Sequence, residues 1–329
     1  MGGSLTRPYS AFACVALGLA ACAPSEAATP ADSAAPVADG VAVGVGSAGA
    51  RFVNNILGFQ GPESVRYDPE QDVFYVSNMV GYGSGKDNNG YVTRVDAGDP
   101  NRATILVQGG TPNVTLNSPK GLAIHGDTLW VADIDALRGF DRRTGVPLAT
   151  IDFTAAGAVM LNDVAVAPDG TLRVTDTGIH MNKVGVPHTG PDRIYAVGPG
   201  GAISVVAEGL KLRQPNGIAW DSAGKRWIVV SFDPFVGEVA ALDASGRRVL
   251  RTGKGRLDGV EVLRDGSILF TSWADSSLHR LRGTRDEKIV REVPDAADIG
   301  IDTRRQRVAI PLSTLGRVQL WQLRDPTRR

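Results

Sequence analysis

The sequence lacks the features that mark several large classes of protein. It has two cysteines, a formal net charge of zero, no helical heptad pattern and no apolar run long enough to span a bilayer. The balanced charge gives no indication of a basic groove, and we expect no nucleic-acid partner. The chain is rich instead in glycine, with 40 residues among 329, and has scattered prolines. This composition favours an all-β protein with many turns.

The N-terminus carries a pattern typical of an export signal. A short apolar stretch, Ala11–Ala21, runs into the tetrapeptide Leu19-Ala20-Ala21-Cys22. This tetrapeptide resembles a bacterial lipobox, in which the cysteine becomes lipidated and then N-terminal. We therefore predict a lipoprotein signal peptide at residues 1–22 and an exported protein at the periplasmic face of the outer membrane, held there only by its lipid. The alternative is an ordinary signal cleaved near Ala23 or Ala28, which would give a soluble periplasmic or secreted protein.

The same interpretation leaves no disulfide. Cys14 would be removed with the signal peptide and Cys22 would be acylated, so an oxidising compartment adds no covalent stabilisation. Residues 23–50 are rich in Ala, Pro, Ser, Asp and Gly, and such a segment cannot bury enough apolar surface to fold alone. We interpret it as a flexible tether. In the alternative, its last part, Val41–Val45, adds an outer strand to the final sheet.

A pattern repeats through the predicted globular domain, residues 51–329. Each copy has a leading residue, alternating apolar residues, a turn and a second apolar strand. The leading residues are Glu63, Lys120, Asn162, Asn216 and Asp258, with Ala297 opening a sixth and weaker copy. Their separations are 57, 42, 54, 42 and 39 positions, and periods near 40 with several strands each are typical of a β-propeller. We predict an all-β fold, a six-bladed β-propeller with four-stranded blades.

This fold places the leading residues together. The innermost strand of each blade runs along the axial channel, so the six first residues form a ring at one mouth. Because strands alternate in direction, the loops between second and third strands return to the same mouth. Two of these loops are long, Asn78–Gly90 and Thr177–Asp192. Long loops around a rigid ring are where binding sites are built.

Four ring members are oxygen donors: Glu63, Asn162, Asn216 and Asp258. Two carboxylates and two amides on one axis would repel each other or lack partners unless a hard divalent cation lay between them. We predict Ca²⁺, which accepts six to eight oxygens, with Zn²⁺, Mn²⁺ and Mg²⁺ as alternatives. The ring holds no Cys or His, which argues against a closed zinc site, and its four ligands leave positions open for water or substrate. In the alternative, the Asn-Gly and Asp-Gly pairs are ordinary turns.

These motifs carry a resemblance to a known family. They are Glu63, Asn162-Asp163, Pro215-Asn216-Gly217 and Asp258-Gly259. Over about residues 60–325 the chain resembles the senescence-marker-protein (regucalcin), gluconolactonase and luciferin-regenerating-enzyme family. The resemblance implies that the four oxygen donors hold one divalent cation in the central tunnel, and that the protein hydrolyses a lactone or ester. Two positions depart from the family pattern, because Ser64-Val65 replace Gly-Pro and Lys120 is a cation in the ring.

Further side chains are candidates for chemistry at the mouth. We predict that Asp258, an acid at the rim, also acts as general base or nucleophile. His180, on the second long loop, would shuttle a proton or else be a solvated loop residue. Lys120 would bind a substrate carboxylate or polarise a carbonyl, or else form a structural ion pair with Asp298 or Glu63. Trp273 follows a second strand and would wall the substrate pocket, or else pack between blades.

Two functions from different classes fit this pattern. The first is a divalent-metal-dependent hydrolase for a small-molecule lactone or ester, with Lewis acidity at the ring and a stabilised oxyanion. The second is a non-catalytic binding propeller of the cell envelope. Two strand openings of this chain, Ser118–Leu122 and Pro215–Ile218, resemble those of NHL-type repeats. In that case a cation only staples the channel, and a protein or envelope polymer binds the face. We favour the hydrolase and expect a monomer.

Overall fold

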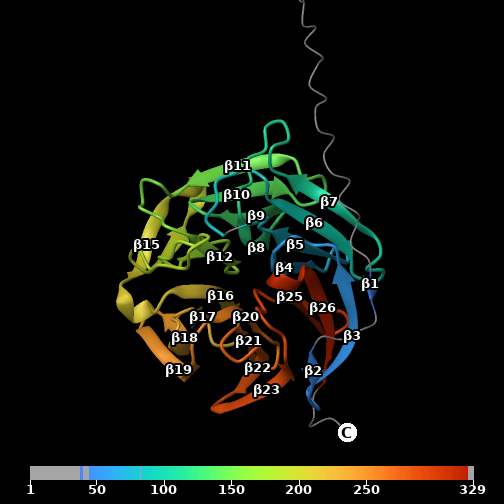
Figure 1. Ribbon diagram of the computed structural model, residues 1–329. Helices are drawn as coiled ribbons and strands as arrows, with labels where there is room; N and C mark the ends of the chain where they lie inside the picture. The colour runs from blue at the N-terminus through green and yellow to red at the C-terminus, as the bar shows by residue number, and fades with distance from the viewer. Residues whose placement is uncertain (1–37, 40–43, 82, 325–329) are drawn as a thin grey trace, which may run out of the picture. The chain divides into compact units, whose positions relative to one another are not determined.

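Six sheets of antiparallel strands are arranged around a central axis (Figure 1). The computed structural model describes residues 38–39, 44–81 and 83–324. In each sheet the strands follow one another outward from the axis, and in five of the sheets the four inner strands are consecutive in the chain. The predicted six-bladed β-propeller is therefore confirmed.

The first five blades each contain four consecutive strands, innermost first. Blade one has β4 (Pro62–Asp68), β5 (Val73–Asn78), β6 (Tyr91–Asp96) and β7 (Ala103–Gln108), and blade two has β8 (Pro119–His125), β9 (Thr128–Asp133), β10 (Ala136–Asp141) and β11 (Pro147–Asp152). Blade three has β12 (Leu161–Val166), β13 (Leu172–Asp176), β14 (Arg193–Val197) and β15 (Ile203–Glu208), and blade four has β16 (Pro215–Asp221), β17 (Arg226–Ser231), β18 (Val236–Asp243) and β19 (Gly246–Lys254). Blade five has β20 (Leu257–Val262), β21 (Ile268–Ser272), β22 (Ser277–Arg282) and β23 (Arg285–Arg291).

The sixth blade joins the two ends of the described chain. It contains β24 (Gly300–Asp302), β25 (Arg307–Leu312) and β26 (Arg317–Leu323), and its fourth strand is β3 (Ala50–Leu57), which comes before blade one. Figure 1 shows β3, in blue, beside β26, in red. The antiparallel pairing of β3 with β26 closes the ring, so the propeller has no long open edge at the junction.

The segment expected as a tether is partly built into these sheets, which corrects its boundary. Two-residue strands β1 (Ala38–Asp39) and β2 (Val45–Gly46) pair with the outer edges of β3 and β23. The outer strand of blade five thus gains a partner, whereas the sequence suggested one only for the final sheet. Glycine permits this packing, because a Cβ on Gly46 would lie 2.4 Å from the Ala50 carbonyl oxygen. The predicted signal peptide lies outside the described residues, as do most of the tether and residues 325–329.

Apolar side chains between blades hold the ring together. The second strand of blade one, β5, is buried along its whole length, and Trp321, Ile289 and Val308 pack in one cluster between blades five and six. Full burial of one such aliphatic side chain contributes about 1.5–3 kcal/mol. The described helical segments are three single 3₁₀ turns, η1 (Pro199–Gly201), η2 (Leu210–Leu212) and η3 (Ser313–Leu315). No described helix has the length and apolarity to cross a membrane.

Candidate functional site

The innermost strand of each of blades one to five has the same irregularity at its start. In blade one, Pro62 pairs with Asn78 but Val65 pairs with Val76, so the inner strand has one more residue than its neighbour. The same one-residue bulge occurs in blades two, three, four and five. It contains the leading residue of each repeat. A bulge bends its strand and re-aims its side chains, which turns these five leading residues toward the channel mouth.

Hydroxyl groups on the second strands support the bulges in alternate blades. The backbone N–H of Ser64 donates to Ser77 Oγ at 2.9 Å, and that of Asp163 donates to Thr175 Oγ1 at 3.0 Å. In blade five the N–H of Gly259 donates to Thr271 at 2.8 Å. Each hydroxyl satisfies an N–H that the bulge removes from the regular ladder. The ring residues are therefore fixed by both backbone and side-chain hydrogen bonds.

The five bulge residues meet at one small cavity of about 20 Å³. They are Glu63, Lys120, Asn162, Asn216 and Asp258, and each is at most 6% exposed. The cavity holds one water-sized particle or a single ion. Ala297, the sixth leading residue, is buried and does not line the cavity. The structure thus brings together all four predicted metal ligands, with Lys120 beside them.

Three of the four predicted ligands have a buried oxygen atom without a partner. Glu63 Oε2, Asn216 Oδ1 and Asp258 Oδ1 accept no hydrogen bond from any described residue. Most buried polar atoms in native proteins are satisfied, and each that is not costs about 1–3 kcal/mol. Three such oxygens, from blades one, four and five, surround a single cavity. They indicate a shared ligand that is coordinated by oxygen atoms.

The raised pKa values of the two ring carboxyls also indicate a bound positive ligand. Burial raises the pKa of Glu63 well above its ordinary value, and the negative charge of Asp258 raises it further, while Lys120 opposes this. Burial also raises the pKa of Asp258, with added repulsion from Asp298 and Asp163. Ionising both carboxyls at neutral pH therefore requires a compensating positive charge beyond the one on Lys120.

The donor set fits a hard divalent cation. Two carboxylates and two amide carbonyls are oxygen ligands of the kind that Ca²⁺ takes, and Ca²⁺ readily adds waters or substrate oxygens to complete its shell. Among the described residues no three His, Cys, Asp or Glu side chains are grouped to hold a metal ion. A site here would therefore depend on its two asparagines as much as on its two acids.

Lys120 is held by neutral oxygen atoms. Its Nζ donates to the Gly83 carbonyl at 2.5 Å, to the Ser118 carbonyl at 3.0 Å and to Ser118 Oγ at 3.3 Å. Burial lowers its pKa to about 8, against the attraction of Glu63 and Asp133. It makes no ion pair within 4.0 Å in the described part of the chain, so neither Glu63 nor Asp298 is a direct partner. Lys120 therefore fastens the blade-one loop, at Gly83, to the ring.

Apolar side chains form the outer wall of the cavity. They are Met79, Ile179, Met181, Phe232 and Trp273. They come from the segments that follow the second strands of blades one, three, four and five, as the alternation of strand direction predicts. Trp273 packs edge-on against Phe232, with ring centroids 5.2 Å apart. The structure therefore places Trp273 at the cavity, where it also packs against its neighbour.

His180 is not brought to this site. It lies on the predicted long loop of blade three, but its side chain is exposed and does not line the cavity. The loop instead presents its neighbours Ile179 and Met181 to the ring. The N–H of Met181 donates to Ser84 Oγ at 2.9 Å, so the loops of blades one and three meet over the mouth.

A second set of buried acids, Asp163 and Asp298, lies beside the ring residues, and the sequence-based prediction assigned no role at the site to it. Ser64 Oγ donates to Asp298 at 2.5 Å, and Asp163 accepts the backbone N–H of Ile218 at 2.7 Å. Burial raises the pKa of Asp298 to about 6, although Arg66 and Ser64 lower it. These acids directly follow leading residues of the repeat, inside or beside the bulges. A search for polar residues at the next repeat position would have found them.

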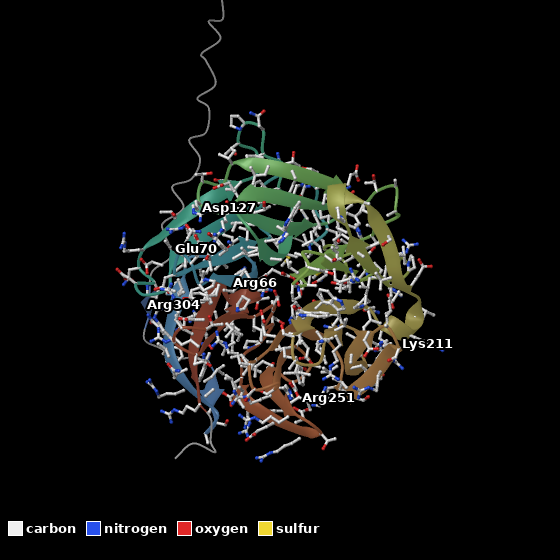
Figure 2. All side chains as sticks on the ribbon, turned by 180° about the vertical axis from the view of Figure 1, so that it is seen from behind. Arg66, Glu70, Asp127, Lys211, Arg251 and Arg304 are labelled. Carbon is white, nitrogen blue, oxygen red and sulfur yellow. The ribbon has the colours of Figure 1, made fainter. Side chains whose placement is uncertain are left out.

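The opposite mouth of the channel is wider and chemically different. A cavity of about 870 Å³ lies there, with Arg66 and Glu261 among its lining residues and none of the ring residues. Arg66 forms an ion pair with Glu261 at 2.5 Å and donates to the Leu122 carbonyl at 2.7 Å. Figure 2, seen from behind, places Arg66 near the middle of the propeller. The larger cavity therefore has paired charges, whereas the small one has unpaired oxygens.

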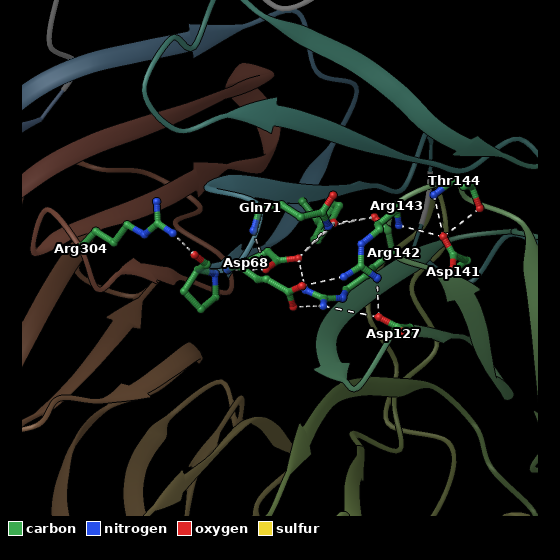
Figure 3. Close-up of polar contacts among 11 residues, drawn as sticks. Asp68, Gln71, Asp127, Asp141, Arg142, Arg143, Thr144 and Arg304 are labelled. Atoms are coloured by element: carbon green, nitrogen blue, oxygen red, sulfur yellow. Dashed lines mark hydrogen bonds and ion pairs between the residues drawn. The ribbon is translucent and has the colours of Figure 1, made fainter.

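A charged network beside this mouth joins blades one and two. Arg142 is buried and donates to Asp68 at 2.7 Å, and it also contacts Glu70 and, at 3.5 Å, Asp127 (Figure 3). The Tyr75 hydroxyl donates to the Arg142 carbonyl at 2.5 Å. All these contacts lie within the protein, so the network stabilises the packing of the two blades.

Comparison of the sequence with family models shows the family of this chain. The SMP-30/gluconolactonase/LRE-like region family matches residues 61–298, a range that contains all four predicted ligands. The chain belongs to this family. Among curated proteins, none matches its sequence.

Solved structures share the fold at low sequence identity. A gluconolactonase from Xanthomonas campestris is 17% identical with a TM-score of 0.64, covering 88% of this chain and 100% of that one. A luciferin-regenerating enzyme is 13% identical with a TM-score of 0.61, covering 89% and 96%. A calcium-binding protein, regucalcin from Agrobacterium tumefaciens, is 17% identical with a TM-score of 0.58, covering 80% and 90%.

Proposed function

We propose that the protein is a divalent-metal-dependent hydrolase of lactone or ester bonds. The observation that carries this proposal is the small cavity at which three blades each present a buried oxygen atom with no partner. Membership of a family that includes gluconolactonases supports a lactone as substrate. The relative described as calcium-binding supports Ca²⁺ as the ion.

Four side chains would hold the ion: Glu63, Asn162, Asn216 and Asp258. A divalent cation in this place supplies Lewis acidity to a carbonyl oxygen and lowers the pKa of a water molecule. The bulges hold the four ligands in position before substrate arrives, so little reorganisation is needed at the moment of reaction. The apolar wall excludes bulk water, which strengthens each electrostatic interaction inside.

Asp258 is the proposed base. In the hydrolysis, the oxygen of a water molecule bonds to the carbonyl carbon and the carbon–oxygen bond of the lactone ring breaks. Asp258 accepts a proton from that water and returns it to the departing alkoxide, which gives a hydroxy acid. Asp258 suits this role because one of its oxygens is free of hydrogen bonds to any described residue. Glu63 is also an acid, but it lies nearer the positive charge of Lys120.

Metal analysis and kinetics on the purified protein test the proposal. We expect about one Ca²⁺ per chain, and hydrolysis of lactones or aryl esters that stops in a chelator and returns with Ca²⁺. Asp258→Asn retains a ligand oxygen but cannot accept the proton, so kcat should fall by about 10²–10⁴-fold. Turnover undiminished in this variant would remove Asp258 from the mechanism. No turnover of any lactone or ester would favour the binding propeller.

We also propose that the protein is exported and anchored by a lipid on Cys22. Support comes from the sequence pattern around this residue, which lies outside the described part of the chain. The first described strands are tied to the propeller edge, so the length of chain between lipid and domain is shorter than the segment 23–50.

A further inference from the structure

The proposed function does not define the class of lactone or ester that is hydrolysed. The residues of the cavity wall limit which substrates fit. Half of the ten lining residues are apolar, and four of these five pack together as one cluster above the ring, namely Ile179, Met181, Phe232 and Trp273. The five apolar residues come from four different blades, so the apolar surface surrounds the ring on several sides. The part of a substrate beyond its reacting carbonyl would lie against this cluster.

The wall offers few hydrogen bonds. The polar side chains of the lining are the four proposed ligands and Lys120. All three donor positions of the Lys120 ammonium face acceptors within the protein, the Gly83 carbonyl and two oxygens of Ser118. A substrate hydroxyl buried here would lose its water partners without gaining others, and one such loss lowers kcat/KM by about tenfold.

Trp273 is the one wall residue with a hydrogen-bond donor in its side chain. Its indole Nε1–H is buried and has no hydrogen-bond partner among the described residues. A buried indole N–H normally has an acceptor, and Trp273 borders the cavity where the substrate carbonyl would react. The N–H is therefore an unused donor on a residue that borders the cavity, and it suits an ester oxygen.

The part of the wall formed by Met79 and Met181 beside Gly83, which we call the roof of the cavity, can change its shape. The sulfur atoms of Met181 and Met79 lie 2.9 and 3.5 Å from the point where a Cβ on Gly83 would be, so these three residues are closely packed. The cavity of about 20 Å³ has room for an ion but not for a lactone, and substrate entry requires the roof to move. Methionine is unbranched and flexible, so it can repack around chains of different shape.

We propose that the substrate is a lactone or ester with alkyl or aryl substituents, held by a hydrogen bond from Trp273, and not a polyhydroxylated sugar lactone. The proposal rests on the proposed hydrolase function and deepens it. It rests on the residues of the cavity wall and not on the proposed metal ligands.

A set of six-membered lactones tests the substrate class. Full-length protein in Ca²⁺ is assayed with δ-valerolactone, δ-decalactone and glucono-δ-lactone, which share the ring and differ in substituents. We expect kcat/KM for δ-decalactone to exceed that for δ-valerolactone by about tenfold and that for gluconolactone by at least about a hundredfold. Equal or faster turnover of gluconolactone would overturn the substrate class and leave the hydrolase function standing.

Binding provides a readout without turnover. Calorimetry with 6-pentyl-2-piperidone and gluconolactam, the unreactive lactams of the two substituted lactones, should show binding of the first and weaker or no binding of the second. If no lactone is hydrolysed but this preference holds, the hydrolase function is wrong and the apolar pocket is right. If gluconolactam binds as well as the alkyl lactam, the pocket assignment is wrong.

A matched pair of variants tests Trp273. Trp273→Phe keeps an aromatic wall but removes the N–H, and it should lower kcat/KM for δ-decalactone by about five- to tenfold. Trp220→Phe is the control, since Trp220 also has a buried N–H without a partner and packs edge-on on an aromatic ring, but it lines the cavity at the opposite mouth. Equal effects of the two variants would remove Trp273 from substrate binding.

A second pair tests the roof. Met181→Gln adds an amide to the wall at similar volume, and Met181→Leu keeps it apolar. We expect the Gln variant to raise the ratio of gluconolactone to δ-decalactone turnover by about tenfold and the Leu variant to leave this ratio unchanged. A ratio that is the same in both variants would contradict the proposed contact between roof and substrate.

Discussion

Removal of the cation should destabilise the propeller, and the effect should depend on pH. Without it, Glu63 and Asp258 are buried carboxyls with pKa values raised by burial. The unfolded chain ionises both groups from about pH 4, whereas the folded protein holds their protons to higher pH. The metal-free protein therefore loses stability as pH rises from about 4 through the raised pKa values. Ca²⁺ favours the ionised form of both groups, so its stabilising effect grows over the same range.

The magnitude follows from ligand linkage. An ion at a hundredfold excess over its Kd stabilises the folded state by about 2.7 kcal/mol. In a domain of this size 1 kcal/mol corresponds to about 2 °C in Tm, so Ca²⁺ at that excess should raise Tm by about 5 °C near neutral pH. Near pH 4.5 protons compete for Glu63 and Asp258, and the difference between loaded and metal-free protein should become small.

Thermal unfolding with Ca²⁺ or with a chelator, at pH 4.5 and 7.5, measures this difference. Two variants should shift the Tm of the metal-free protein in opposite directions at pH 7.5. Asp258→Asn removes an uncompensated buried carboxyl and should raise Tm, whereas Glu261→Gln removes the partner of Arg66 and should lower it. A Tm that does not respond to Ca²⁺ at pH 7.5, or a lower Tm in Asp258→Asn, would refute the reasoning.

Three further predictions concern other parts of the chain. Lys120→Met should lower Tm, because the Gly83 carbonyl loses its donor, yet tighten Ca²⁺ binding about tenfold by removing a charge beside the ring; isothermal titration showing weaker binding would contradict this. Cys22→Ser should move the protein from the membrane fraction to the soluble periplasm, unless the wild type is already soluble and lacks acyl mass. Asp275 and Asp286 raise the pKa of His279 despite its burial, so this histidine stabilises the fold fully below about pH 6.5 and less as pH rises through the raised value. His279→Gln should therefore cost more stability at pH 6 than at pH 9, and equal losses would contradict the assignment.

The repeat made the fold and the ring predictable. Residues as far apart as Glu63 and Asp258 occupy the same position in their repeats, and one propeller geometry brings that position to the channel mouth. The sequence could not show how the side chains are aimed. A one-residue bulge at the leading residues of blades one to five changes the strict alternation of these strands. Asp163 and Asp298, which follow leading residues, are buried against the inner strands of neighbouring blades, where they contact Ile218 and Ser64.

The two short N-terminal strands and the conformation of the His180 loop could not be predicted from a sequence pattern. Residues 38–39 and 45–46 are poor in strand-forming residues, yet they pair with open strand edges whose backbone groups need partners. The chemistry of histidine and its place on a long loop favour His180 as a site residue, but the hairpin formed by this loop turns Ile179 and Met181 inward and leaves His180 exposed. Loop conformation depends on contacts with other blades, such as the one between Met181 and Ser84, which have no fixed sequence pattern.

A crystal structure of the protein grown in Ca²⁺ tests the central claim most directly. The account predicts one ion in the small cavity, with oxygen atoms of Glu63, Asn162, Asn216 and Asp258 at about 2.3–2.6 Å from it, and an anomalous signal that disappears after chelation. A water molecule at this position under saturating Ca²⁺, with the two carboxyls hydrogen-bonded to each other or paired with Lys120, would contradict it.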